Sequence, residues 1–240
     1  PESYSLYNSD GNTITGTVAN NTRVTDFFGN LTPGGSQVFS GFRPANVVSK
    51  GRNSMALYTD MELDLTEKLL INGAIRFENY SDFGSTTNFK LASRYKLTNN
   101  INLRGALSNG FRAPSLHQIY FSTTATLFSN GVPSEIATFS NDSQMAKLLG
   151  IPQLKQEVSQ SGSIGFTAKI PDANLTLTAD AYVVNVKDRV VLTSSFSRPG
   201  GTPAPGTPAE VLNGLFDGAG ATSATFFANA IDTQSKGIDI

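Results

Sequence analysis

The central part of the chain alternates between apolar and polar residues with a period of two. From Met55 to Leu65 the odd positions are mostly apolar, and the even positions are mostly polar or charged. A second run with the same alternation begins at Leu69, and further runs follow. Because successive side chains of a β-strand point to opposite faces, this pattern predicts strands with one apolar face and one wet face.

Seven segments show this pattern. Their ranges are 55–65, 69–78, 89–97, 101–108, about 156–169, about 175–192, and one that starts near 226 and runs to 240. Short turns are expected near 66–67, 98–100 and 171–174, and long links at 78–86, 111–154 and 193–225. Long strands joined alternately by short turns and long loops are typical of outer-membrane barrels. The sequence therefore predicts an all-β fold, an antiparallel up-and-down transmembrane β-barrel, present in part, with about seven long strands and long outer loops.

The alternation also predicts which side chains share a face. The apolar set expected on the convex face comprises Met55, Leu57, Leu63, Ile71, Ile75, Phe89, Leu91, Leu103 and Leu107. The charged set expected on the concave face comprises Asp60, Glu62, Arg76, Lys90, Arg94 and Arg104. We further expect Arg76 to lie within ion-pair reach of an acidic residue of the first strand, because opposite charges on paired strands stabilise their pairing.

The composition is more typical of a single layer of barrel strands than of a domain with a packed core. Hydrophobic residues make up 39% of the 240 residues and charged residues 15%, against roughly 45–50% and about 25% in ordinary soluble domains. The net charge of −1 gives no indication of nucleic-acid binding. The chain has no cysteine, which excludes disulfides and thiolate metal sites. An alternative is a secreted, soluble β-sandwich that serves as a binding or adhesion module, since its strands also alternate.

Several short segments resemble one family. The residues at the end of the fourth strand resemble the Gly-Phe-Arg-Ala-Pro signature of TonB-dependent receptor barrels, and they are Gly110, Phe111, Arg112, Ala113, Pro114 and Ser115. The stretches 76–84 and 154–157 are also similar to the family, with Gln156 in place of a proline. Further matching positions lie in the stretches 178–182 and 227–239, and they are Asp180, Tyr182, Asn229, Asp232, Thr233 and Gly237.

The resemblance implies an outer-membrane receptor. Such receptors bind a scarce nutrient, such as an iron-siderophore, haem, cobalamin or a carbohydrate, and import it with energy coupled through TonB. The implied partners are outer-membrane lipid, the nutrient ligand, and the TonB complex, which acts through the plug region. The implied location is the bacterial outer membrane, and in this family the Gly-Phe-Arg-Ala-Pro segment closes a strand and opens a large outer loop.

The same comparison predicts the domain organisation. We expect residues 1–240 to be part of one barrel domain, with an outer loop over 1–51 and strands and loops over 52–240. The chain begins at Pro1 and stops inside an alternating pattern at Ile240, so we expect an internal fragment of a longer protein. The plug domain and the TonB box have no counterpart in it, and whether it could transport alone is open.

Few residues suggest chemistry. Arg112 is a candidate rim residue for contact with substrate or plug, but we favour a structural role at the strand-to-loop corner. His117 is the single histidine, so a structural role is favoured over metal binding. Asp60, Glu62 and Asp64 share a face because of the alternation, which favours a solvated lumen over a hydrolase pair. No nucleotide-binding fingerprint or nucleophile with a base is present, and we predict a protein that is not an enzyme and has no cofactor.

Overall fold

A computed structural model describes residues 2–6, 46–129 and 132–240, and the chain divides into two compact units. The sheet unit comprises Arg52–Pro114, Lys155–Val190 and Asn229–Ile240. The loop unit comprises Pro1–Gly51, Ser115–Leu154 and Val191–Ala228. The predicted strands therefore belong mainly to one unit and the predicted long links mainly to the other.

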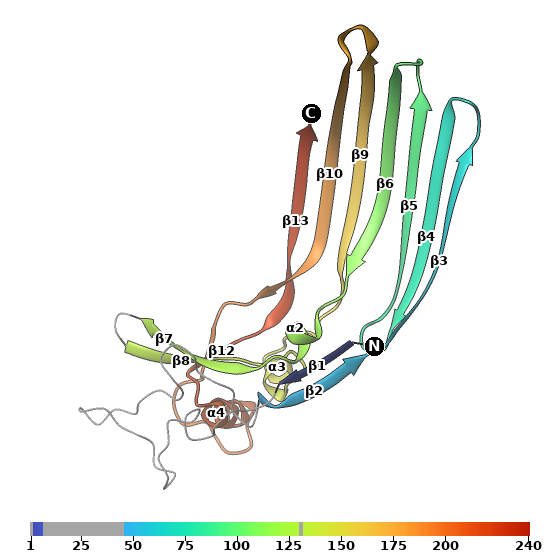
Figure 1. The fold of residues 1–240 in the computed structure, drawn as a ribbon. Coiled ribbons are helices and arrows are strands. Elements are labelled where there is room, and N and C mark those ends of the chain that lie inside the picture. Colours follow the sequence, from blue (N-terminus) through green and yellow to red (C-terminus); the bar gives the residue numbers. More distant parts are fainter. Residues whose placement is uncertain (1, 7–45, 130–131) are drawn as a thin grey trace. The chain divides into compact units, whose positions relative to one another are not determined.

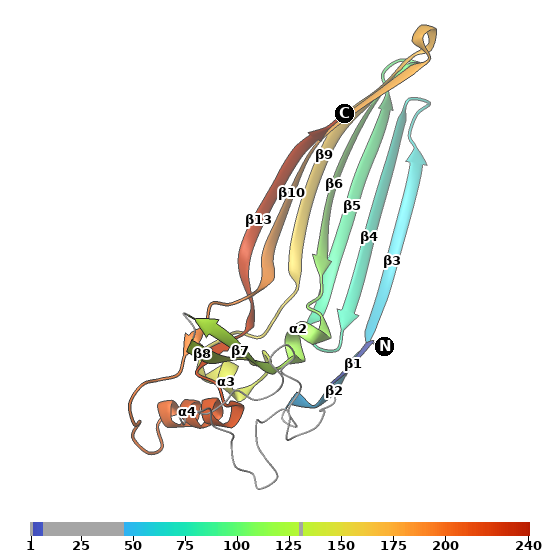
Figure 2. The same cartoon turned by 60° about the vertical axis from the view of Figure 1, so that its left-hand side comes forward.

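Seven strands form a single sheet in the sheet unit. They are β3 (Ser54–Asp64), β4 (Leu69–Tyr80), β5 (Gly84–Lys96), β6 (Ile101–Arg112), β9 (Glu157–Ile170), β10 (Leu175–Leu192) and β13 (Phe227–Asp239). Their spatial order is the same as their order along the chain, from β3 at one edge to β13 at the other. Figures 1 and 2 show one curved layer of long strands that run alternately up and down. The expected antiparallel up-and-down architecture is confirmed, as an open part of a barrel.

The strand register confirms the grouping of residues on two faces. Residues directly opposite each other in an antiparallel pair lie on the same face. Leu91 of β5 is opposite Leu107 of β6, and the whole apolar set follows the same parity. Arg94 is opposite Arg104, and the six charged residues all lie on the other face. The predicted phase of β3 to β6 is therefore correct.

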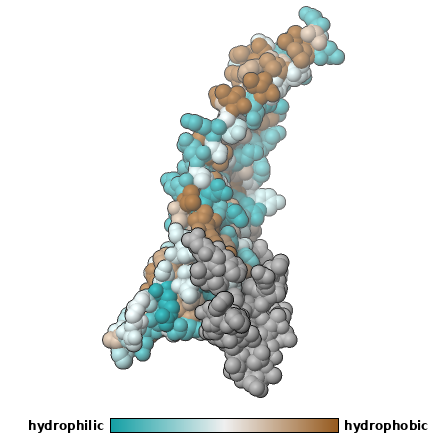
Figure 3. Space-filling model, turned by 90° about the vertical axis from the view of Figure 1, so that its left-hand side faces the viewer, coloured by the Kyte–Doolittle hydropathy of each residue, from teal (hydrophilic) through white to brown (hydrophobic). Residues whose placement is uncertain are grey.

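The apolar face of this sheet is uncovered in the part of the chain that the structure describes. Leu57 is 76% exposed, Met55 74% and Leu107 61%. Figure 3 shows hydrophobic side chains gathered at the surface near the end with the short turns. A β-sandwich would bury such a face against a second sheet about 10 Å away. The sandwich alternative is therefore wrong for this sheet.

One predicted link differs from the structure. The segment 78–86 was expected to be long, but β4 and β5 pair as far as Tyr80 and Gly84, and only residues 81–83 connect them. Gly84 has a φ of 95°, which a residue without a side chain adopts readily. Since the residues near this turn are polar on both faces, alternation of hydrophobicity gave no sign that the strands continue.

The long links contain ordered structure of their own. In the loop unit, β1 (Glu2–Leu6) pairs with β2 (Val48–Arg52). A four-stranded sheet has the order β11 (Phe196–Ser197), β12 (Ser223–Thr225), β8 (Val132–Thr138), β7 (Thr123–Ser129). The helices are α2 (Leu116–Tyr120), α3 (Gln144–Leu148) and α4 (Pro208–Ala219). A small core contains the fully buried Met145, Phe216 and Phe226.

Two further observations complete the fold. Most of the expected outer loop over residues 1–51 lies outside the described residues, which omit 7–45. Among the helices of the described part, none is long and apolar enough to cross a membrane.

Candidate functional site

The segment Gly110–Ser115 turns the chain out of β6 into α2. Gly110 is opposite Ser159 of β9, and a Cβ atom at this glycine would lie 3.0 Å from the Ser159 hydroxyl oxygen. Pro114 is fully buried. Ser115 caps α2 by accepting a hydrogen bond from the Gln118 backbone N–H at 3.1 Å. The signature thus spans the end of β6 and the N-cap of α2, and the structural role of Arg112 stays a prediction.

Arg112 contacts the neighbouring strand. Its Nη1 lies 3.7 Å from Oε1 of Glu157, the residue directly opposite on β9. The Arg112 side chain is 63% exposed, whereas that of Glu157 is 8% exposed. The same Glu157 oxygen accepts a hydrogen bond from the Val190 backbone N–H at 2.9 Å. Glu157 thus connects β6, β9 and β10 at the ends of these strands.

Two of the family-matching residues of β13 form hydrogen bonds to a residue of β10 with an unusual backbone conformation. Asp188 has a φ of 56°, a left-handed conformation that is uncommon outside glycine. Asp232 Oδ1 accepts from its backbone N–H at 3.0 Å, and Asn229 Nδ2 donates to its carbonyl at 2.6 Å. Asn229 also exchanges two hydrogen bonds of 2.9 Å with the backbone of Lys155. The side-chain amide of Asn229 therefore bonds the backbone of both Lys155 and Asp188.

Thr233 and Lys155 add weaker contacts to this region. Arg189 Nη1 lies 3.5 Å from the Thr233 hydroxyl, and Lys155 Nζ lies 3.3 Å from an Asp188 carboxylate oxygen. Together with Arg112 and Glu157, these residues form a polar network over the loop-proximal ends of β6, β9, β10 and β13. We call it the rim network. It joins two sequence motifs that lie more than a hundred residues apart.

A second buried cluster surrounds Arg52. Its guanidinium donates to both oxygens of Asp82, with contacts of 2.7 to 3.1 Å, and to the Pro114 carbonyl at 2.7 Å. The guanidinium carbon also lies over the rings of Tyr80 and Phe83, at 5.7 and 5.3 Å from their centroids. The Arg52 side chain is only 3% exposed. Sequence analysis missed this cluster, because nothing in the alternation links residues 52 and 82.

On the polar face, two residues of the family-matching stretches, Asp180 and Tyr182, lie over glycines of the neighbouring strands. Arg104, Gly165 and Asp180 occupy one register row of β6, β9 and β10, and Arg104 forms an ion pair with Asp180 across the middle strand. A Cβ atom at Gly165 would meet Asp180 and would lie 2.6 Å from the Ala179 carbonyl. Likewise the ring of Tyr182 covers Gly237 of β13. The glycines leave the space in which these side chains lie.

The expected pairing of Arg76 is wrong. Arg76 forms its ion pair with Glu78 of its own strand. The register places Tyr58 directly opposite it, with the guanidinium 5.8 Å from the centre of that ring. Asp60 lies opposite Ala74 and accepts a hydrogen bond from Asn72 at 2.7 Å instead. The acidic residues of β3 and Arg76 share a face but not a register row.

The described residues give little sign of ligand chemistry. His117 stacks on Phe121 with 4.3 Å between ring centroids, and no group of three metal-ligating side chains occurs in the described ranges. The loop unit contains a hollow of about 320 Å³ between β7, β8 and α4. Its lining includes no charged residue, and Thr124 there donates to the Ala219 carbonyl at 3.2 Å. The lining therefore does not identify a substrate.

Comparisons with known proteins indicate the family of the chain. The model of the family described as TonB dependent receptor-like, beta-barrel, matches residues 2–240. No curated protein matches the chain. A ferric enterobactin receptor (PfeA) variant from Pseudomonas aeruginosa, solved with enterobactin, has a TM-score of 0.59 and 14% identity over 98% of this chain and 28% of that one.

Two further solved structures are similar. The siderophore receptor PirA from Acinetobacter baumannii has a TM-score of 0.54 and 17% identity, over 79% of this chain and 25% of that one. PirA from Pseudomonas aeruginosa has a TM-score of 0.57 and 15% identity, over 81% and 32%. At these identities the likeness concerns the fold alone. The chain spans about a quarter to a third of the length of these receptors.

Proposed function

The chain belongs to the family of TonB-dependent receptor β-barrels, and we propose that it forms part of the wall and outer loops of a receptor that imports a scarce nutrient across the bacterial outer membrane. We propose an iron-siderophore as the nutrient, ahead of haem, cobalamin or a carbohydrate. The similar structures described as siderophore receptors support this choice. The family and these neighbours are receptors rather than enzymes.

The observation that carries the proposal is the two-faced single sheet. One face exposes large apolar side chains, and the other carries ion pairs such as Arg104–Asp180. A sheet in hydrocarbon has to satisfy its backbone groups by closure, with apolar residues outward and polar residues inward. The sheet has this division of faces, and the remainder of the full-length receptor would supply the strands that close it.

We assign the substrate contacts to the loops and the rim network to positioning. The links over residues 111–154 and 193–225 carry ordered elements, and in the family such long links are outer loops. Arg112 contacts Glu157, and Glu157 holds β10. Arg112 is therefore proposed as a positioning residue that keeps the strand ends in place beneath the loops. The plug region outside this chain would make the contact with the TonB complex.

Uptake by living cells tests the proposal. The gene for the full-length receptor is deleted, and the uptake of iron from a panel of ferric siderophores is measured with a radioactive iron tracer. We expect the uptake of at least one siderophore to be lost, to return with the wild-type gene, and to stop when a protonophore removes the proton gradient. Membrane fractionation should find the receptor in the outer membrane.

Specific outcomes would contradict it. If haem, cobalamin or carbohydrate uptake falls while every siderophore is still imported, the substrate class is wrong. If no uptake changes, the transport function is wrong. An Arg112→Ala receptor should retain its affinity for the ligand within about twofold, the range expected when no substrate contact is removed, whereas a strong loss of affinity would place Arg112 in the substrate site.

A further inference from the structure

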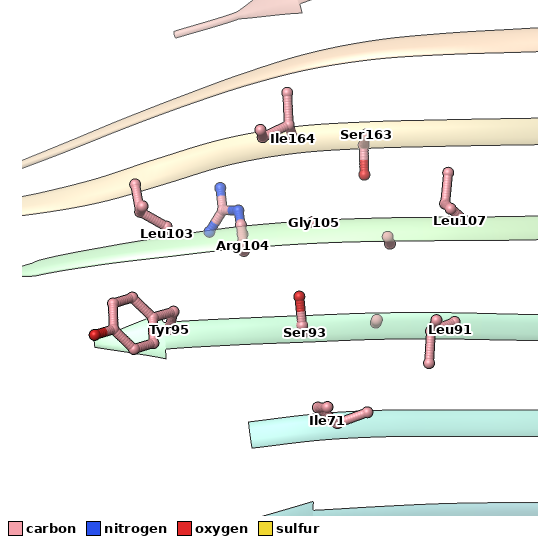
Figure 4. A pocket seen from close by; sticks show the side chains of 12 residues that line it. Ile71, Leu91, Ser93, Tyr95, Leu103, Arg104, Gly105, Leu107, Ser163 and Ile164 are labelled. Carbon is pink, nitrogen blue, oxygen red and sulfur yellow. The ribbon is translucent and has the colours of Figure 1, made fainter. Parts of the chain in front are cut away.

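A hollow of about 530 Å³ lies in the apolar face of the sheet unit (Figure 4). Its centre is a register row in which Ser93 of β5 and Gly105 of β6 lie side by side, between Ile71 of β4 and Ile164 of β9. The neighbouring rows carry larger side chains, with Leu91 and Leu107 on one side and Tyr95 and Leu103 on the other. Two small residues in the middle of a large-residue face thus produce the depression.

The lining of the hollow suits an uncharged, apolar occupant. Leu91 is 52% exposed, Leu107 61% and Ile164 70%, so the hollow is an open trough. Arg104 borders it, but its guanidinium is bonded to Asp180 and Thr167. Among the lining residues on the apolar face, Ser93 and Tyr95 carry the polar side-chain groups, which are hydroxyls.

A row of amides marks one edge of the apolar face. Gln160 of β9 lies opposite Asn109 of β6 on one side and opposite Asn185 of β10 on the other. Gln234 of β13 extends this row by donating to the Asn185 amide oxygen at 2.7 Å. Asn109 lies four residues from Gly105 along β6, roughly 13 Å. The amides therefore lie on the same face as the hollow but on its loop-proximal side.

The other end of the face is closer. Ser93 lies three residues before the end of β5, at Lys96, roughly 10 Å along the strand. Tyr95 lies between Ser93 and this end and is 42% exposed. Tyrosines at such a level in membrane proteins place the ring in hydrocarbon and the hydroxyl among headgroups. The hollow therefore occupies the half of the apolar face that adjoins the short turns.

We propose that this hollow holds one acyl chain of a phospholipid from the membrane leaflet on the short-turn side. The inference rests on the proposed function, since it requires the apolar face to contact lipid. A flexible chain can follow the trough and contact Gly105 and Ser93, where the wall would otherwise lose close contacts. The hydroxyl of Tyr95 would lie on the headgroup side of the occupant.

Photolabelling of the full-length receptor tests the proposal. The receptor is reconstituted into phosphatidylethanolamine vesicles that contain a small fraction of lipid with a diazirine on one acyl chain. After illumination, labelled peptides are located by mass spectrometry. We expect labelling to concentrate on residues 91–107, with less on residues 73–77 of β4, which do not line the hollow. Gly105→Leu and Ser93→Leu, which fill the hollow from different strands, should each reduce it there by about fivefold, equivalent to about 1 kcal/mol.

Gly73→Leu is the matched control. Gly73 lies on the same face, opposite Met61 and Leu91, with open space around it. This variant adds the same side chain outside the hollow and should leave the labelling of residues 91–107 unchanged. Two hollow-filling variants are used so that the test still holds if one of them fails to fold. Variants that still take up siderophore are counted as folded.

The other outcomes separate the two proposals. Uniform labelling of the apolar face, or labelling that both filling variants leave intact, would overturn the acyl-chain site but not the membrane barrel. Labelling of the polar face in place of the apolar face would overturn both. Unlabelled lipopolysaccharide is added in a competing arm, and displacement of the label by it would show that the occupant is not a phospholipid.

Discussion

The Arg52 cluster gives the sharpest test of how this wall is held together. The Arg52 guanidinium, which is only 3% exposed, donates hydrogen bonds to Asp82 and to the Pro114 carbonyl. Removing one partner of a buried ion pair costs about 3–5 kcal/mol, because the other charge stays buried and loses that partner. Asp82 is 17% exposed, which places the expected loss for Asp82→Ala at the lower end, about 3 kcal/mol.

A conservative variant and a double variant define the mechanism. Arg52→Lys keeps the charge but loses the planar fork that contacts both carboxylate oxygens, so we expect a loss of about 2 kcal/mol. The variant with Arg52→Ala and Asp82→Ala removes both charges together. Its destabilisation should be smaller than the sum of the single losses, with a coupling energy of about 2 kcal/mol.

The assay is urea unfolding of the full-length receptor refolded into lipid vesicles. The folded fraction is measured by gel electrophoresis of unboiled samples, because a folded barrel migrates differently before and after boiling. A coupling energy below about 0.5 kcal/mol, the range of exposed ion pairs, would refute the reasoning. So would equal stability of the Arg52→Lys and wild-type receptors, because the fork would then contribute nothing.

The same unfolding measurement tests three further changes. Gly165→Ala should destabilise the receptor by about 1–3 kcal/mol, because the added methyl group overlaps the ion pair that crosses β9. Gly73→Ala, with open space around the residue, should be neutral within about 0.5 kcal/mol. Equal effects of the two substitutions would contradict the close approach at Gly165. Asn229→Asp should cost about 2 kcal/mol, since a carboxylate oxygen replaces an amide donor to two backbone carbonyls. A neutral result would show that these two hydrogen bonds do not stabilise the rim network. Gly237→Ala should cost about 1 kcal/mol, but much less in a Tyr182→Ala background, and an unchanged cost would show that the ring does not limit the space.

The alternation predicted the faces of the strands well because lipid and water select side chains by polarity alone. The range 175–192 for β10 agrees with the structure, and the apolar and charged sets fall on opposite faces as expected. Where both faces are polar, the criterion fails. The turn at residues 81–83 was therefore mistaken for a long link, and the ordered elements between residues 115 and 154 were not predicted.

Contacts between strands needed a different kind of information. The partner of Arg76 depends on which residue of β3 lies opposite it, and alternation does not specify register. The predicted acidic partner was replaced by Glu78 for this reason. The Arg52–Asp82 pair joins the last residue of β2 to the turn after β4, so it could be foreseen only after the hairpin length was known. The motif residues were found through family resemblance, and their roles in the rim network required coordinates.

Register in such a wall requires more than the two faces. A slip of one residue would exchange the faces of a strand, and exposed Leu107 or Ile164 would then meet water. A slip of two residues keeps every side chain on its face, so polarity does not oppose it. It would, however, move Ser163 or Thr167 into the place of Gly165, beneath the ion pair of Arg104 and Asp180. The glycine and the ion pair therefore select one register among those that alternation allows, as Gly237 does beneath Tyr182.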